Sequence, residues 1–181
     1  MEKKKRKQER IGLVIVNTGN GKGKTTAALG TALRAVGSGF NVFMVQFIKG
    51  PWKAGEHDIA EKLKPNFEIR RMGEGFTWNT KDRERDTEVA AKAWAFCKEL
   101  IEKEKHDLLI FDEINVAMDL GYLDPAEVVD ALKKKPKLMH IILTGRGAPD
   151  VLIEAADLVT EMREIKHPFN AGIYAQKGIE F

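Results

Sequence analysis

Short apolar runs alternate with segments of helical periodicity along nearly the whole chain. The runs are strand-sized and rich in β-branched and aromatic residues, with apolar residues at successive positions. That pattern is typical of strands buried on both faces of a parallel sheet. Six strands are predicted, at residues 12–18, 40–48, 66–73, 107–113, 137–146 and 158–165.

Helices are predicted between these strands, because apolar residues there recur every three or four positions. They begin at about Lys24 and then span 54–63, 82–105, 124–132 and 149–157. The helix after Asp124 has a clear start signal: an acidic N-cap, Pro125 at the first helical position and Glu127, which is expected to reach back to the cap. Residues 170–181 contain too much glycine for a helix, and we expect an extended arm near the functional site.

This order of elements predicts an α/β fold. Strands that alternate with helices form parallel βαβ units with right-handed crossovers, which gives a doubly wound, mostly parallel sheet with helices on both faces. Ligands bind such sheets at the carboxyl ends of the strands. The segments after Thr18 and Phe47, the pair Asp112–Glu113 and the turn 144–146 are therefore expected to gather at one edge.

Composition adds limits to this picture. A chain of 181 residues with 43% apolar and 31% charged residues suits one globular domain, predicted at 12–181 after a basic segment at 1–11. No apolar run is long enough for a membrane span, and no signal peptide is recognised, so we expect a cytoplasmic protein. The net charge is only +3, with the excess gathered in the basic segment. A nearly neutral remainder disfavours a nucleic-acid-binding face.

Cysteine and histidine usage argues against a zinc site and against a disulfide within the chain. The single cysteine, Cys97, falls in a predicted helix and is expected to be a small buried hydrophobe. The four histidines are scattered without metal-ligand spacing, which disfavours a zinc site.

The strongest motif is the glycine-rich stretch "VNTGNGKGKTTAALG", between the first predicted strand and helix. Successive backbone N–H groups and a helix N-terminus make such a turn a phosphate cradle. Its candidate nucleotide-binding residues are Gly19, Asn20, Gly21, Lys22, Gly23, Lys24, Thr25 and Thr26. The common phosphate-loop pattern G-x-x-x-x-G-K-[ST] would require glycine where Thr18 stands, so counted from Gly19 the loop is one residue short. The fold expected is that of a phosphate-loop nucleoside triphosphatase, RecA-like.

An acidic pair, Asp112–Glu113, closes the apolar run "LLIFDE" and is expected to complete a Mg²⁺ site with Thr25. Spacing does not decide which carboxylate meets the metal. Arg146, in "LTGRG", is a candidate contact for phosphate or for carboxylates of a second substrate, with a structural ion pair as the alternative.

Two aromatics, Phe76 and Trp78, lie in the glycine-rich stretch "GEGFTWNT", which follows a predicted strand. They either plug this loop onto the core or line a site for a large flat ligand at the carboxyl edge.

These motifs together resemble the ATP:corrinoid adenosyltransferases of the bacterial phosphate-loop type. The resemblance rests on "TGNGKGKTTAALG", "VQFIKGPWKAGE", "GEGFTWNT", "LLIFDEIN", "LTGRGAP" and "EMREIKHPFNAGIYAQKGIEF", and extends from about Gly12 to the C-terminus. It implies transfer of the 5′-deoxyadenosyl group of ATP to the Co(I) of a reduced corrinoid, with release of triphosphate. The resemblance also implies that ATP would be bound in the reverse of the usual sense, with the altered loop as part of that arrangement.

The resemblance also implies roles and partners. Lys24 and Mg²⁺ would offset the charge of the leaving triphosphate, and Phe76 and Trp78 would lie below the corrin and displace its lower axial ligand. A reduced flavoprotein would supply electrons, and the enzyme would be a homodimer. In relatives a longer N-terminal segment folds across the partner's active site; here the segment before the first strand is short.

Two rival functions remain open on the sequence. A kinase or NTPase with conventional γ-phosphate chemistry could use Glu113 and Arg146, although the short loop and the aromatic pair argue against it. A nucleic-acid-binding ATPase is allowed by the basic N-terminus alone, and salt-dependent retention on single-stranded DNA would distinguish it.

Overall fold

The computed structural model describes residues 10–48, 54–73, 75 and 82–180. Within these ranges six strands form one sheet, in the order β3-β2-β4-β5-β1-β6, and every neighbouring pair is parallel. The strands are β1 (Val14–Thr18), β2 (Val42–Gln46), β3 (Phe67–Arg71), β4 (Leu108–Asp112), β5 (His140–Thr144) and β6 (Leu158–Glu161). Each lies inside the range predicted for it.

The predicted helices are also present. They are α1 (Lys24–Gly37), α2 (Gly55–Lys62), α4 (Arg83–Lys103), α6 (Pro125–Lys133) and α7 (Asp150–Ala155). A short helix that was not predicted, α5 (Ile114–Asp119), begins directly after the acidic pair. No Pro or Gly separates it from the strand before it, so the sequence does not mark where it starts. A single 3-10 turn, η1 (Pro168–Ala171), interrupts the C-terminal arm, which has no α-helix in its described part.

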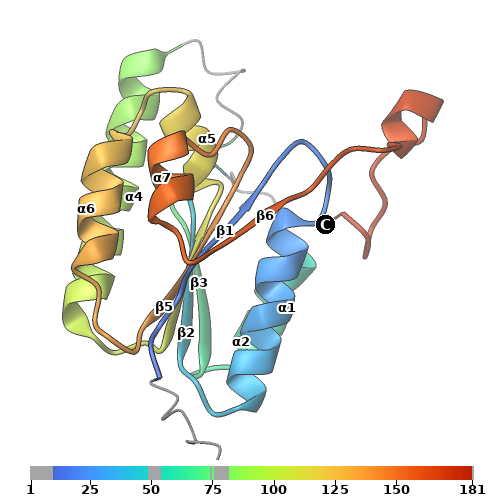
Figure 1. The fold of residues 1–181 in the computed structure, drawn as a ribbon. Helices are drawn as coiled ribbons and strands as arrows, with labels where there is room; N and C mark the ends of the chain where they lie inside the picture. The colour runs from blue at the N-terminus through green and yellow to red at the C-terminus, as the bar shows by residue number, and fades with distance from the viewer. Residues whose placement is uncertain (1–9, 49–53, 74, 76–81, 181) are drawn as a thin grey trace, which may run out of the picture.

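Helices cover both faces of the sheet, which confirms the doubly wound fold. Figure 1 shows α1 and α2 on one side and α4, α5, α6 and α7 on the other. The strand order explains this arrangement. The chain moves in one direction across the sheet from β1 to β3 and in the opposite direction from β3 to β6, and right-handed crossovers therefore place the two sets of helices on opposite faces.

Successive strand residues serve two separate cores. In β4, Leu109 and Phe111 pack beneath α4 and α6, whereas Leu108 and Ile110 pack beneath α1 and α2. All four are at most 2% exposed. Burying such side chains stabilises the fold by about 1.5–3 kcal/mol each. This use of both faces explains why the strands are continuous apolar runs rather than alternating ones.

The start of α6 corrects one prediction. Asp124 caps the helix as expected, since its Oδ1 accepts from the N–H of Ala126 at 2.9 Å. Glu127 does not complete the predicted capping box. Its Oε1 instead accepts from Trp94 Nε1 at 3.0 Å and from Lys98 Nζ at 2.6 Å, both on α4. A packed neighbouring helix offers the carboxylate a stronger donor than the cap does.

Other expectations have mixed outcomes. Cys97 is fully buried in α4, and burial raises the pKa of its thiol well above the ordinary value, as suits a buried hydrophobe. None of the helices in the described ranges has the length and apolarity needed to cross a bilayer. The basic residues before Arg10 and the pair Phe76 and Trp78 lie outside the described residues.

Candidate active site

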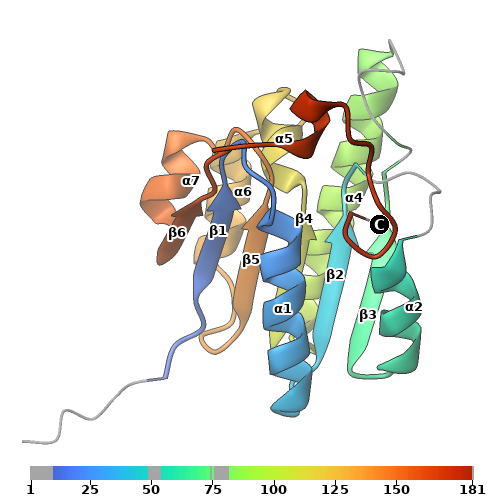
Figure 2. The ribbon, with the colours of Figure 1, turned by 90° about the vertical axis from the view of Figure 1, so that its right-hand side faces the viewer.

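The glycine loop connects β1 to α1 at the carboxyl edge of the sheet, which is the upper edge in Figure 2. Gly23 is the N-cap of α1, so Lys24, Thr25 and Thr26 form the first turn of the helix. Inside the turn, the buried amide of Asn17 donates to the carbonyl of Lys24 at 3.3 Å. This bond fixes the angle at which the chain leaves the strand and enters the helix.

Lys24 lies within the loop rather than in solvent. Its Nζ donates to the carbonyls of Gly19 at 2.8 Å and Gly21 at 2.7 Å, and the residue is only 7% exposed. Burial lowers the pKa of its ammonium from the ordinary value; Arg146 and Lys22 lower it further, and the charge of Glu113 opposes them. The charges of Lys22, Glu113 and Arg146, which come from three different loops, therefore all act on the buried ammonium of Lys24.

The acidic pair meets the loop through Thr25. The Thr25 hydroxyl donates to Asp112 Oδ1 at 2.7 Å, and the Thr144 hydroxyl donates to the same oxygen at 2.7 Å. Thr144 Oγ1 also accepts from the backbone N–H of Glu113 at 3.0 Å. Asp112 is fully buried, whereas Glu113 is half-buried and has the left-handed φ of 63° at the cap of α5. The two carboxylates thus lie in different surroundings.

The end of β5 is joined to the other two strand ends by Asn115. Its Nδ2 donates to the Gly145 carbonyl at 3.1 Å and more weakly to the Asn17 carbonyl at 3.5 Å. Arg146, the next residue, is exposed. The side chain of Asn115 is fully buried, so its two bonds hold β1, β4 and β5 together just below the loop.

The segment after β6 holds the loop from its outer side. The Gly21 N–H donates to the Met162 carbonyl at 2.6 Å. A Cβ on Gly19, whose φ is 90°, would lie 2.5 Å from the Met162 carbonyl oxygen, and one on Gly21 would lie 2.7 Å from the backbone of Arg163. These two glycines are therefore required by the packing of the chain itself, besides any approach of phosphate.

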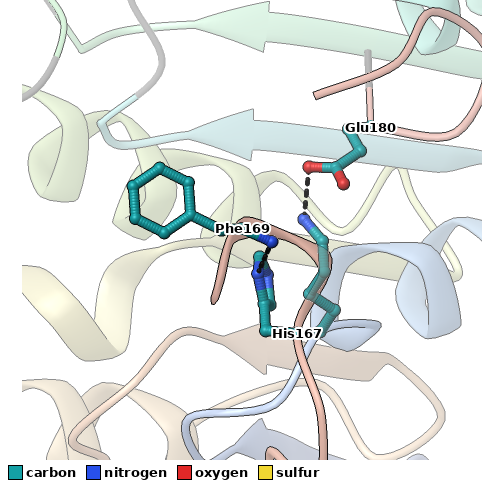
Figure 3. A network of polar contacts seen from close by, with 4 residues as sticks. His167, Phe169 and Glu180 are labelled. Carbon is teal, nitrogen blue, oxygen red and sulfur yellow. Dashed lines mark hydrogen bonds and ion pairs between the residues drawn. The ribbon is translucent and has the colours of Figure 1, made fainter. Parts of the chain in front are cut away.

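The C-terminal arm reaches the same loop. It leaves β6, extends on the α1 side of the sheet and returns toward the loop (Figures 1 and 2). Glu180 then forms an ion pair with Lys22 at 2.5 Å (Figure 3). The arm is stiffened at η1, where Nδ1 of His167 accepts from the Phe169 N–H at 3.2 Å. Its predicted position near the site is confirmed by the contact at Lys22.

The predicted site residues are thus largely brought together. Gly19, Gly21, Lys24, Thr25, Asp112 and Glu113 form one connected group, while Asn20, Lys22, Thr26 and Arg146 are exposed around it. Sequence reasoning missed the polar side chains of Asn17, Gln46, His57 and Asn115 and the backbone carbonyl of Met162, and it placed Thr144 at this edge without giving its hydroxyl a role. The signal for two of them was a polar residue inside or ending a buried apolar strand, as in "FMVQFI" and "IILTG".

A glycine loop between a buried parallel strand and a helix, with an enclosed lysine and a threonine bonded to an aspartate at the end of another strand, defines a phosphate-loop nucleotide-binding protein. The fold agrees: the flagellar accessory protein FlaH from Methanocaldococcus jannaschii superposes with a TM-score of 0.55 at 13% identity, over 84% of this chain and 71% of that one. Within this class, the chain belongs to the ATP:corrinoid adenosyltransferase family BtuR/CobO/CobP, whose sequence profile matches residues 10–181.

Curated relatives support the same family along the full chain. A corrinoid adenosyltransferase from Sinorhizobium sp. is 50% identical over 100% of this chain and 89% of its own length. Another, from Escherichia coli strain K12, is 45% identical over 96% of this chain and 88% of its own length. The chain is therefore a transferase that moves the adenosyl group of ATP to a corrinoid, and a conventional kinase or NTPase activity is not favoured.

Proposed function

We propose that the triphosphate of ATP lies in the loop Gly19–Thr26 and leaves as a unit when the corrinoid is alkylated. In this reaction the lone pair of Co(I) attacks C5′ of ATP, and the C5′–O5′ bond breaks. Its electrons leave with the triphosphate, and the cobalt becomes an alkyl-Co(III) centre. The observation that carries the proposal is the position of the Lys24 ammonium, which lies on the Gly19 and Gly21 carbonyls at the base of the loop.

Lys24 is suited to offset charge on the departing triphosphate. Its ammonium is already desolvated, so phosphate oxygens would replace carbonyl oxygens as its partners without a new cost of dehydration. Exposed Lys22 and Arg146 add positive charge at the mouth of the loop. Asn20 and Thr26 complete the set of residues that we assign to the nucleotide.

The donors beside the loop fit Mg²⁺. They are hard oxygen ligands, a hydroxyl from Thr25 and carboxylates from Asp112 and Glu113, and Mg²⁺ takes one or two carboxylates together with phosphate oxygens. When bound, the ion would neutralise charge on the triphosphate. Asp112 already accepts from two hydroxyls and an amide. We therefore assign Asp112 to orienting Thr25, and Glu113 to the metal.

The second substrate is assigned from the family resemblance. Phe76 and Trp78 would lie below the corrin and displace its lower axial ligand, which makes the four-coordinate Co(II) easier to reduce. A reduced flavoprotein would be the electron donor, and the enzyme would act as a homodimer in the cytoplasm. Large apolar side chains on the described part of the C-terminal arm, such as Phe169 at 71% and Tyr174 at 85% exposed, are consistent with further contacts to a partner or to the corrinoid.

The test is an anaerobic reaction of the protein with Mg-ATP and pre-reduced Co(I) cobalamin, followed by optical spectroscopy and phosphate analysis together. We expect a light-sensitive alkyl-cobalt spectrum with one triphosphate per cobalt. An unchanged corrinoid with accumulating orthophosphate would instead mean that the loop performs conventional γ-phosphate chemistry.

A further inference from the structure

A buried glutamine contacts the acidic pair from the neighbouring strand. Gln46, the last residue of β2, stands opposite Asp112 in the parallel register of β2 and β4. It is fully buried in an otherwise apolar strand, and its Nε2 donates to Asp112 Oδ2 at 3.2 Å. Burying an amide is costly unless its polar atoms are bonded, so the position of Gln46 requires a partner for its oxygen as well.

That partner is His57, at the start of α2. Its Nε2 lies 2.8 Å from Gln46 Oε1, and its Nδ1 accepts from the backbone N–H of Ala54 at 3.1 Å. Because Nδ1 accepts this bond, the ring proton belongs on Nε2, which therefore donates to the glutamine oxygen. The helix cap thus sets the histidine tautomer, and the histidine sets which end of the amide faces Asp112.

Three donors then hold the Asp112 carboxylate. Oδ2 accepts from Gln46, while Oδ1 accepts from the hydroxyls of Thr25 and Thr144. A carboxylate bonded through one oxygen can turn about its Cβ–Cγ bond, whereas bonds on both oxygens fix its plane. With the plane fixed, the Thr25 hydroxyl is held in one position beside the loop.

We infer that Gln46 and His57 are positioning residues for the metal side of the nucleotide site, and that they act through Asp112 on Thr25. The inference rests on the proposed Mg²⁺ site. It gives the first turn of α2, which contributes no other candidate residue, a function in catalysis. Gln46 contacts Asp112 and His57 contacts Gln46, so their assigned role is to position other residues of the site.

Nucleotide binding measured across a Mg²⁺ titration tests this inference without a corrinoid. Gln46→Met keeps the length and apolar body of the side chain but removes the amide. We expect it to raise the Mg²⁺ concentration that half-saturates tight ATP binding by about tenfold, the effect of losing one hydrogen bond to a charged group. His57→Phe should raise that concentration by about threefold, and His57→Gln, which can still donate to Gln46, should restore it. ATP binding without Mg²⁺ should be the same in all variants.

His106→Phe is the matched control, because this half-buried histidine packs edge-on against Phe43 of the same strand β2 but lies outside the hydrogen-bond chain. It should keep the wild-type Mg²⁺ requirement even if the melting temperature falls. Should Gln46→Met fail to fold, the His57 pair carries the test, since it leaves β2 intact. An unchanged Mg²⁺ requirement in folded variants, beside a Mg²⁺-dependent wild type, overturns this inference alone. Wild-type binding that is independent of Mg²⁺ overturns it together with the proposed metal site.

Discussion

The phosphate loop is held in shape by contacts on both of its sides. On the inner side the Lys24 ammonium bonds to two of its carbonyls, and on the outer side Met162 accepts from Gly21. Gly19 is the position where both demands meet, because its carbonyl accepts from Lys24 while a Cβ at this position would overlap the Met162 backbone. Gly19 therefore has no room for a side chain, even without a bound nucleotide.

Gly19→Ala should consequently lower the free energy of unfolding by about 1–3 kcal/mol, through a strained φ and an overlap with backbone. Gly30→Ala is the matched control. Gly30 lies inside α1 with nothing within 4 Å of the added carbon, so the substitution should stabilise the helix by about 0.5–1 kcal/mol. Urea unfolding of both variants measures these two changes in the free energy of unfolding. Equal effects of the two substitutions would contradict the role of Met162.

A second prediction for individual residues concerns the proposed role of Phe76 and Trp78. If Phe76 and Trp78 displace the lower ligand of the corrinoid, Phe76→Ala with Trp78→Ala should lose turnover from Co(II) substrate and keep much of its activity on pre-reduced Co(I). The reason is that displacement assists the reduction and not the attack on C5′. Comparing rates from the two oxidation states measures this directly. Equal losses on both substrates would eliminate the displacement role.

Among the elements, α4 and α6 are linked by Glu127, which accepts from Lys98 and from the indole of Trp94. Trp94 is 2% exposed and packs edge-on against Phe111 of β4. The carboxylate thereby connects the solvent-facing side of the helical layer to the core beneath it. The hydrogen bond from Lys98, followed by the one from Trp94, lowers the pKa of Glu127 from its ordinary value of 4.5, against the effect of desolvation.

Glu127→Gln should lower the free energy of unfolding by about 0.5–1 kcal/mol at pH 7, a modest amount because the side chains of Lys98 and Glu127 are 42% and 52% exposed. A lowered acid pKa means that this stabilisation is complete above the unfolded value near 4.5 and is lost as the pH falls through the folded value. The difference between variant and wild type should therefore shrink as the pH falls below 4.5 and vanish below the folded pKa. Denaturant unfolding across this pH range measures it. Glu88→Gln, at a wider and more exposed pair with Lys92, should show no difference at any pH.

At the scale of the whole molecule, one edge of the sheet collects every candidate residue that the structure describes. The order β2-β4-β5-β1 places Gln46, Asp112, Thr144 and Asn17 at the ends of four adjacent strands. Two apolar layers on opposite faces hold these strands rigidly. A site built on strand ends therefore needs little rearrangement, and nucleotide binding should be coupled to the stability of the entire domain.

Saturating Mg-ATP should raise the free energy of unfolding by about 2.7 kcal/mol at a hundredfold excess over its Kd. Lys24→Met should lose most of that increase. Without nucleotide the variant should differ from the wild type by less than this ligand-induced increase, because the loss of the two hydrogen bonds to Gly19 and Gly21 is offset by removal of a desolvated charge, whose burial lowers the pKa of Lys24. The cost of burying this charge disappears as the pH rises through the folded pKa toward 10.5. Thermal melts with and without Mg-ATP measure both effects, with Lys92→Met as the control. A full ligand shift in Lys24→Met would contradict the assignment.

The sequence by itself determined the six strands, the five predicted helices, the glycine loop and the acidic pair, because each of these is encoded over a short stretch of chain, and the order of the elements determined the fold class. Buried parallel strands are continuous apolar runs, and a phosphate loop needs its glycines, lysine and threonine in consecutive positions. The motifs likewise sufficed for the family, since they are spread over the whole domain.

Only the tertiary structure decided how those parts are used. The donors to Asp112 are Thr25, Gln46 and Thr144, which lie 87, 66 and 32 positions away from it in the sequence. No local pattern therefore reveals that Asp112 orients Thr25. The contact of Met162 with Gly21 depends on the pairing of β6 with β1, and the choice of Glu127 between its helix cap and α4 depends on how two helices pack. Contacts between distant segments exist only after the strand order is established, and several orders are compatible with the same alternation of strands and helices.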